Sequence, residues 1–272
     1  MKRFATITIS LIASVYIGAS GYMYAAQESL IFKPSNKVQP VEKIFPGALE
    51  HQINTPDGER LQLWYKTAKP NQPTLVYLHG NAGNLSTRQR LIEALSADGR
   101  GLVIFSWRGF GQSSGQPSEL GLYQDARAVF DWLTTQNLPS EQLFVYAESL
   151  GTGVATQMAS ERDFAGVILA APYTSIAEMA KLDYPWLPVD LLLEHRFDSL
   201  SRIQSVNEPM VILHSRDDRV IPFQLGEKLA KASPEHTKFQ GFTDRGHTGF
   251  TKADIDSAMA WLRSQAKSSP QR

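Results

Sequence analysis

Ser149 stands in the setting that a nucleophilic serine requires. A short apolar strand is predicted over residues 143–146 and a helix over residues 154–160, so the serine falls at a strand–turn–helix junction. Its neighbours are mostly small, in the run Ala147-Glu148-Ser149-Leu150-Gly151, because bulk two positions to either side would clash where the backbone turns sharply. The usual pattern is G-x-S-x-G, and Ala147 replaces the first glycine. We interpret the segment as a tight elbow that exposes the Ser149 hydroxyl.

A serine hydroxyl is a weak nucleophile, and it needs a neighbouring base that a carboxylate orients. The chain supplies both after later predicted strands, in the order Ser, Asp, His that accompanies such an elbow. Asp217 and Asp218 follow the strand over residues 210–213, and His247 follows the strand over residues 237–240. A loop histidine is usually only solvated, and adjacent aspartates are often turn residues. The position of His247 after the last strand nevertheless favours a catalytic base, with one of the two aspartates as its acid.

The other five of the six histidines fit the role of base less well. His51 and His236 lie within or before predicted strands, and His195 lies in an irregular segment. His79 and His214 end predicted strands, where their contexts suggest that they shape loops. The chain has no H-E-x-x-H motif, no cluster of His and Asp and no cysteine, so we predict neither a metal site nor a cofactor.

Acyl chemistry at Ser149 would also need two backbone N–H donors for the developing oxyanion. We expect one from Leu150, directly after the serine, and the other from Asn81 in the run His79-Gly80-Asn81-Ala82-Gly83-Asn84. Gly80 lets the backbone turn so that the Asn81 N–H faces the site. The same run also fits an ordinary Gly-rich turn, whereas a phosphate-binding loop would end in Lys-Ser or Lys-Thr, which is missing.

Alternating strands and helices are predicted to position these residues. Strands are expected at 51–54, 61–65, 74–78, 102–105, 143–146, 167–170, 210–213 and 237–240, and helices at 87–96, 120–134, 154–160, 224–231 and 255–265. This alternation predicts an α/β domain with right-handed crossovers and a mostly parallel sheet of eight strands. The opening hairpin around Pro56-Asp57-Gly58 makes the sheet mixed. Functional residues should gather at the carboxyl ends of the strands.

Residues 173–202 interrupt the alternation and are predicted to form a small helical insertion above the edge of the sheet. Tyr173, Tyr184, Trp186 and Leu187 would suit the wall of an apolar acyl pocket, although such residues are more often ordinary packing. A crossover helix with a long loop is the simpler alternative.

The length and amino-acid composition of the chain are typical of a single globular domain. The chain has 272 residues, 42% of them hydrophobic, and Lys+Arg and Asp+Glu are balanced at 27 each. There is no basic stripe with interleaved aromatic residues, so we do not expect nucleic acid as a partner. The absence of cysteine fits an oxidising compartment and excludes disulfides and a cysteine nucleophile.

Residues 1–26 are predicted to form an N-terminal membrane anchor. Residues 4–26 carry no charge, follow Lys2 and Arg3, and are long enough to cross the ~30 Å hydrocarbon core as a helix. The basic pair favours a cytoplasmic N-terminus and an exported domain, which would be periplasmic in a Gram-negative source. A cleaved signal peptide is the alternative. We expect a linker over 27–48, marked by Pro34, Pro40 and Pro46, then the α/β domain over 49–267 and a polar tail over 268–272.

Taken together, these residues resemble the α/β-hydrolase superfamily, and more narrowly its membrane-anchored abhydrolase-domain branch, which includes protein depalmitoylases and bacterial members. The marks are the elbow, the run 79–84, and the segments 27–32, 107–115, 171–175 and 196–200. In that family the acid lies four residues after the histidine that ends the strand, which implies Asp218 rather than Asp217, and the base falls on His247. Ala147 in the elbow and Ser215 after His214 depart from the common pattern.

The resemblance implies a serine hydrolase that cleaves an ester or thioester bond of a small-molecule or lipid acyl substrate through an acyl-enzyme. A serine peptidase on the same fold would use the same residues. A non-catalytic binding protein on a hydrolase scaffold is the alternative from another class, and only Ala147 favours it.

Overall fold

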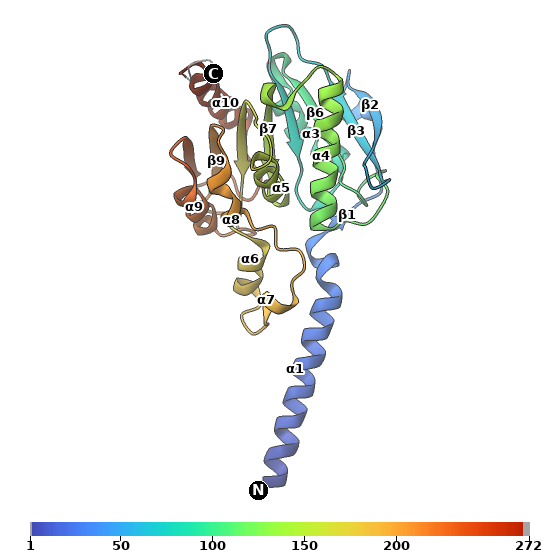
Figure 1. Cartoon of the computed structure of the whole chain (residues 1–272), viewed down its shortest axis with the longest axis vertical. Helices are drawn as coiled ribbons and strands as arrows, with labels where there is room; N and C mark the ends of the chain where they lie inside the picture. The colour runs from blue at the N-terminus through green and yellow to red at the C-terminus, as the bar shows by residue number, and fades with distance from the viewer. Residues whose placement is uncertain (1, 269–272) are drawn as a thin grey trace.

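An eight-stranded sheet forms the centre of the domain in the computed structural model, which describes residues 2–268 (Figure 1). The strand order is β10-β9-β8-β7-β4-β6-β3-β2. Only β3 runs against its neighbours, since it pairs antiparallel with both β2 and β6 while all other pairs are parallel. The predicted mostly parallel sheet is therefore confirmed. Its strands are β2 (Leu49–Asn54), β3 (Arg60–Lys66), β4 (Thr74–Leu78), β6 (Gly101–Phe105), β7 (Leu143–Glu148), β8 (Gly166–Ala170), β9 (Met210–Ser215) and β10 (Thr237–Phe242).

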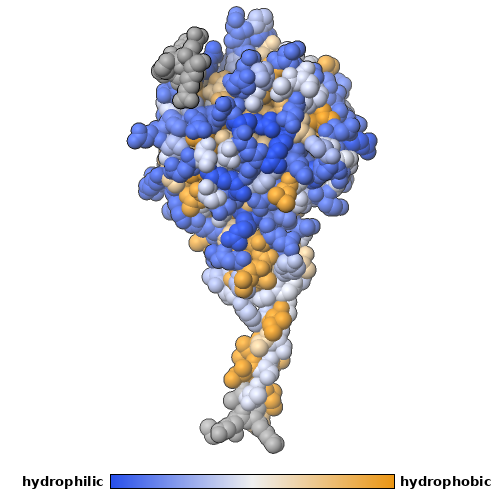
Figure 2. Space-filling view, viewed as in Figure 1, coloured by the Kyte–Doolittle hydropathy of each residue, from blue (hydrophilic) through white to orange (hydrophobic). Residues whose placement is uncertain are grey.

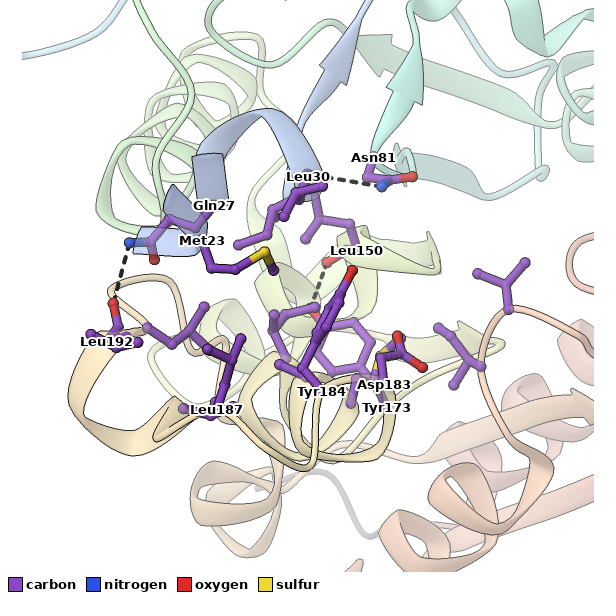
Figure 3. A pocket seen from close by; sticks show the side chains of 18 of the residues that line it. Met23, Gln27, Leu30, Asn81, Leu150, Tyr173, Asp183, Tyr184, Leu187 and Leu192 are labelled. Carbon is purple, nitrogen blue, oxygen red and sulfur yellow. Dashed lines mark hydrogen bonds between the residues drawn. The ribbon is translucent and has the colours of Figure 1, made fainter. Parts of the chain in front are cut away.

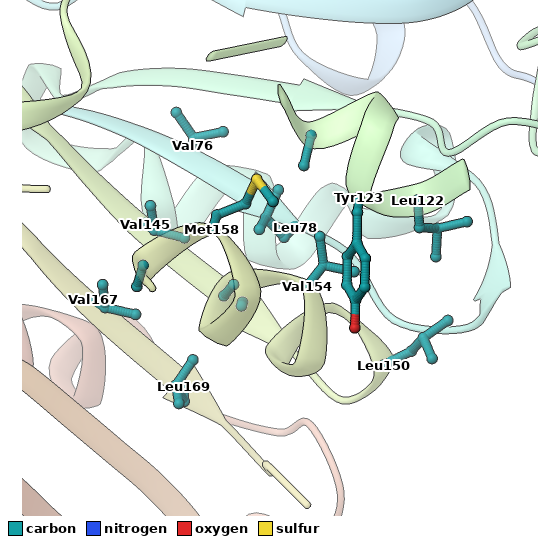
Figure 4. Packing of buried hydrophobic residues seen from close by; sticks show 14 of the residues in the cluster. Val76, Leu78, Leu122, Tyr123, Val145, Leu150, Val154, Met158, Val167 and Leu169 are labelled. Atoms are coloured by element: carbon teal, nitrogen blue, oxygen red, sulfur yellow. The ribbon is translucent and has the colours of Figure 1, made fainter. Parts of the chain in front are cut away.

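The central strands are buried on both faces, and this explains their continuous apolar sequences. Along β4, Val76 and Leu78 face one core while Leu75 and Tyr77 face the other, as the two-residue period of a strand requires. The first core lies under α4 (Glu119–Thr135), α5 (Leu150–Ala159) and α9 (Phe223–Ala232), and Figure 4 shows part of it around Val154 and Met158. The second lies under α3 (Gln89–Leu95) and α10 (Lys252–Ser268).

The predicted helical insertion is present between β8 and β9. It contains α6 (Ile176–Asp183), α7 (Val189–Leu192) and α8 (Ser199–Arg202), and Ser175 caps α6 by accepting a hydrogen bond from the Glu178 N–H. Short 3-10 turns complete the fold at Leu85–Arg88, Ala97–Gly99, Ser140–Gln142 and Ile203–Ser205. The insertion lies at the base of the domain, beside the upper part of the long N-terminal helix (Figure 1).

Helix α1 (Lys2–Ile31) projects from the domain with its N-terminus at the far end (Figure 1). Its segment Thr6–Ile31 is long and apolar enough to cross a membrane, with a mean hydropathy of 1.4 and almost no burial. The helix continues beyond Ala26, where an extended linker was expected, because Gln27 and Phe32 pack into the domain and are nearly inaccessible. The rest of residues 27–48 also folds onto the domain. Strand β1 (Lys33–Pro34) pairs with β5 (Ala82–Gly83), and α2 (Val41–Ile44) joins the second core.

Gly153 is the point where α5 approaches the insertion most closely. A Cβ at this position would lie 2.3 Å from the Tyr173 hydroxyl oxygen and 3.1 Å from the Phe197 Cβ. Alanine normally stabilises a helix interior by about 1 kcal/mol relative to glycine. Here we expect the opposite sign, because Gly153→Ala would overpack the contact and destabilise the fold by about 1–3 kcal/mol. Urea unfolding measures the change, with Gln157→Ala on the same helix as control. A Gly153→Ala variant as stable as the parent would contradict this account of the packing.

Candidate active site

Ser149 occupies a strained turn between β7 and α5. Its φ and ψ are 52° and −121°, in a region that non-glycine residues rarely adopt, and its N–H donates to the Ala170 carbonyl at 3.0 Å. The turn brings backbones so close together that a Cβ on Gly151 would lie 2.2 Å from the Leu78 carbonyl oxygen. Ala147, by contrast, is fully buried within the first core and its methyl group fits there. The elbow thus needs glycine at Gly151 and accommodates alanine at 147.

Ser149, His247 and Asp218 meet at the carboxyl edge of the sheet, on loops that follow three different strands. The Ser149 Oγ lies 2.9 Å from His247 Nε2, and His247 Nδ1 lies 2.8 Å from Asp218 Oδ2. Both distances are those of good hydrogen bonds. The arrangement can pass the serine proton to the imidazole while the carboxylate stabilises the imidazolium that forms.

The environment of Asp218 favours its charged form. Its burial alone would raise the pKa of the carboxyl group, but hydrogen bonds from His214, from His247 and from the N–H groups of Ile221 and Val220 outweigh burial and hold the pKa well below its usual range. Asp217 points elsewhere, because its Oδ1 accepts hydrogen bonds from the Ser215 hydroxyl and from the Gly246 N–H. Of the two candidate acids, only Asp218 contacts His247.

The two expected oxyanion donors lie beside the serine. Leu150 is the first residue of α5, so its N–H has no acceptor within the helix. The Asn81 N–H has no acceptor among residues 2–268, whereas the Asn81 side chain donates to the Ile31 carbonyl at 2.9 Å and its carbonyl accepts from the Lys33 N–H at 2.8 Å. Gly80 passes close to the serine, since a Cβ there would lie 3.3 Å from the Ser149 Cβ.

An apolar cavity of about 330 Å³ begins at Ser149 and is large enough for a small ligand. Three of the four predicted pocket residues, Tyr173, Tyr184 and Leu187, line it, and the Tyr173 hydroxyl donates to the Leu150 carbonyl at 3.1 Å. Trp186 does not line it. Its ring is 47% exposed and lies against Tyr16 of α1, because the turn between α6 and α7 directs it toward the N-terminal helix.

Sequence reasoning missed the wall that α1 contributes to this cavity. Met23, Tyr24, Gln27, Leu30 and Ile31 line it opposite the insertion (Figure 3). No local pattern distinguishes them, because they belong to an apolar run that already has an explanation as a membrane helix.

Two buried polar residues near the reacting groups were also missed as parts of the site. His214 Nε2 lies 3.0 Å from the Ile221 carbonyl oxygen and 3.3 Å from Asp218 Oδ2, so the ring holds both ends of the acid loop. Glu148 lies under the elbow, 3.6 Å from Arg88 Nη1. Burial raises the pKa of Glu148 although Arg88 and His247 oppose the change. In the sequence, the only indication that His214 belongs to the site was its position at the end of a predicted strand. Among residues 2–268, no group of three or more His, Asp or Glu side chains is placed to hold a metal ion.

Comparison with known proteins places the chain in a family. A family profile described as the alpha/beta hydrolase fold matches residues 73–202. An uncharacterized protein of Mycobacterium tuberculosis (strain H37Rv) is 34% identical over 243 residues, which cover 88% of this chain and 86% of that protein. The chain belongs to the α/β-hydrolase family. The resemblance predicted from the sequence motifs is thereby confirmed at the level of this family.

Other relatives of this α/β-hydrolase carry names that indicate an activity. The lysophosphatidylserine lipase ABHD12 of Danio rerio is 34% identical over 72% of this chain, and that of Rattus norvegicus is 35% identical over 66%. The chain spans only 56% and 50% of those two lipases. The Pyrococcus furiosus esterase Pf2001 shares the fold, with a TM-score of 0.67 at 17% identity over 86% of this chain and 97% of the esterase. The likeness to the esterase, at 17% identity, shows that the two proteins share the fold.

Glu148 makes the stability of this α/β-hydrolase depend on pH in a direction that can be measured. Because burial raises its pKa in the folded protein, the folded state binds the proton more tightly than the unfolded chain does. The resulting stability is present below the unfolded pKa and is lost as the pH rises through the folded pKa. The Glu148→Gln side chain stays neutral at all pH values. Its melting temperature should therefore rise relative to the parent's as the pH increases above the unfolded pKa of about 4.3.

The exposed Glu141→Gln serves as the control, and its melting temperature should follow the parent's across the same range. If the difference in melting temperature between Glu148→Gln and the parent were the same at all pH values, the pKa of Glu148 would not be raised in the folded protein.

Proposed function

We propose that this protein is a membrane-anchored serine hydrolase that cleaves ester or thioester bonds of lipid-borne or other acyl substrates. The observation that carries the proposal is the 2.9 Å contact between Ser149 Oγ and His247 Nε2, on an elbow that opens into an apolar cavity. A nucleophile within hydrogen-bonding distance of a base, with that base oriented by a carboxylate, is the arrangement that activates serine.

In the proposed mechanism, Ser149 Oγ attacks the substrate carbonyl carbon and its proton passes to His247 Nε2. The carbonyl oxygen becomes an oxyanion that accepts hydrogen bonds from the Asn81 and Leu150 N–H groups, while Asp218 stabilises the imidazolium. Collapse of the intermediate breaks the bond to the alcohol or thiol, which takes the proton from His247. Water then attacks the acyl-enzyme with His247 as base, and the carboxylic acid leaves with Ser149 restored.

An acyl substrate is favoured over a peptide by the walls of the cavity. Most of the lining residues are apolar or aromatic, and the charged or amide side chains among them are Gln27, Lys33, Asn81 and Asp183. Such a surface suits a hydrocarbon chain better than a hydrogen-bonding peptide backbone. The relatives named as lipases support the same choice, although they are about twice as long as the matched region.

We further propose that α1 remains as an uncleaved anchor and that the domain works outside the cytoplasm. The support for orientation is the Lys2-Arg3 pair before the apolar segment. The support for retention is structural, because residues of α1 line the cavity and Gln27 is buried against the insertion. Removal of α1 by a signal peptidase would leave that side of the cavity open.

The role of Ser149 is tested by Ser149→Ala. Turnover of a short-chain ester should fall by about 10⁴-fold or more, because the nucleophile and its base act as a unit. A fluorophosphonate probe should label the parent and leave the variant unlabelled, while circular dichroism confirms that both are folded. Labelling of the folded variant, or more than a tenth of the parent activity, would assign the nucleophile to another residue.

The two adjacent aspartates provide a matched pair of variants. Asp218→Asn should lower kcat by about 10⁴-fold, because it removes the charge that stabilises the imidazolium and sets the tautomer of His247. Asp217→Asn should lower kcat by roughly tenfold at most, since it weakens hydrogen bonds from the Ser215 hydroxyl and the Gly246 N–H but leaves the contact between Asp218 and His247 in place. Steady-state kinetics on both variants decides the matter, and the reverse order of effects would make Asp217 the acid.

A further inference from the structure

We propose that the insertion tip, defined as Leu182, Trp186 and Leu191, rests in the lipid bilayer beside α1, and that the acyl chain of a membrane lipid enters the cavity from the bilayer along α1. The second half of this inference rests on the proposed function, because it concerns the substrate of the same site. The first half is independent of catalysis.

The cavity follows the axis of α1 from the reacting groups toward the membrane segment. Ile31 lies at the oxyanion loop, where its carbonyl accepts a hydrogen bond from the Asn81 side chain. Met23 is eight residues earlier and also lines the cavity, so the lining extends about 12 Å along the helix at 1.5 Å per residue. An acyl chain bound with its carbonyl at Ser149 would therefore lie alongside α1.

The insertion forms the opposite wall and is fastened to α1 by polar contacts. The Gln27 side chain donates to the Leu192 carbonyl at 3.2 Å and accepts from the Glu194 N–H at 2.9 Å. The Tyr24 hydroxyl donates to Glu194 Oε1. Figure 3 shows Met23 and Leu30 of α1 directed toward Leu187 and Tyr184 of the insertion. A membrane helix thus forms one side of the cavity that reaches Ser149.

The insertion extends along α1 to a depth that the bilayer would occupy. The Tyr16 and Trp186 rings pack edge to face at 6.3 Å, and the Tyr16 hydroxyl donates to the Trp186 carbonyl at 3.2 Å. A hydrocarbon core of ~30 Å takes about 20 helical residues, so a span that begins near Phe4 would end near Met23. Tyr16 lies within that span. Tyr16 is seven residues before Met23, or about 10 Å along the helix, so Trp186 beside it would also lie within the hydrocarbon region.

The insertion tip also exposes large apolar side chains, and the charged Lys181 and Asp190 beside it pair with each other at 2.6 Å. Leu182, Trp186 and Leu191 are 56%, 47% and 85% exposed. Single exposed apolar residues are ordinary, but these three come within ten positions of the sequence, in an insertion that contacts a helix without charge over residues 4–26. Figure 2 shows hydrophobic side chains along α1 that continue onto the base of the domain. Continuity with a membrane helix identifies the lipid bilayer as the partner of this surface.

A label reports the membrane contact without reference to activity. Because the chain has no cysteine, Leu191→Cys gives a single site for an environment-sensitive fluorophore. The control is Leu49→Cys, which is 67% exposed on the edge strand β2, remote from the insertion (Figure 1). The full-length protein is reconstituted into phosphatidylcholine–phosphatidylglycerol vesicles. The emission maximum of the fluorophore at position 191 should then shift to shorter wavelength, and a lipid-borne quencher should reduce its fluorescence. If iodide in the aqueous phase quenched the fluorescence of both labels equally, the proposal would be overturned.

An activity measurement tests the route of the substrate. The Leu182→Glu/Leu191→Glu double variant should hydrolyse a long-chain ester in vesicles roughly tenfold more slowly, because charge is costly within the bilayer. Its kcat/KM for a water-soluble short-chain ester should match the parent's, as should both activities of Leu49→Glu. An unchanged rate on the vesicle ester would overturn entry from the bilayer. A parent protein that hydrolyses neither ester would refute the proposed function, and the label at 191 would still decide the membrane contact.

Discussion

The site depends on one constraint, the left-handed turn of the backbone at Ser149. A φ of 52° on a serine costs about 1–3 kcal/mol, and it persists because the flanking β7 and α5 are almost entirely buried. The turn requires α5 to begin against the end of β4, where a Cβ on Gly151 would overlap the Leu78 carbonyl. It leaves the serine hydroxyl at the carboxyl edge of the sheet. The loops after β9 and β10 end at this edge, so Asp218 and His247 arrive there without any long connection.

The N-terminal helix is joined to the same edge of the sheet. Asn81 donates to the Ile31 carbonyl through its side chain and accepts from the Lys33 N–H, while its own N–H has no acceptor among residues 2–268. The pairing of β1 with β5 continues this connection along the oxyanion loop. The position of α1 and the position of Asn81 are therefore set by the same contacts. In physical terms, α1 is part of the framework of the site as well as a candidate membrane span.

The sequence predicted most of what is local and little of what depends on distant contacts. The strands were predictable because each central one is a continuous apolar run, and the elbow because a sharp turn restricts residue size. The cavity wall formed by α1 was not predictable, since Gln27 meets Leu192 across 165 positions of the sequence. The N-terminal helix was predicted to end too early for the same reason, because burial of Gln27 against the insertion extends the helix beyond Ala26. Trp186 was assigned to the pocket because aromatic residues often line such pockets, but its side chain points away from the cavity and packs against Tyr16.

Two buried carboxyl groups lie within the site, and their environments drive them toward opposite states. Burial alone would raise the pKa of both. At Asp218, hydrogen bonds from two histidines and two backbone N–H groups outweigh burial, whereas at Glu148 the opposing effects of Arg88, at 3.6 Å, of His247 and of Tyr77 do not. Asp218 therefore keeps its charge, and Glu148 is displaced toward its neutral form. The separation of the two pKa values leaves Asp218 as the charge that orients the imidazole, with His214 holding the loop that carries it.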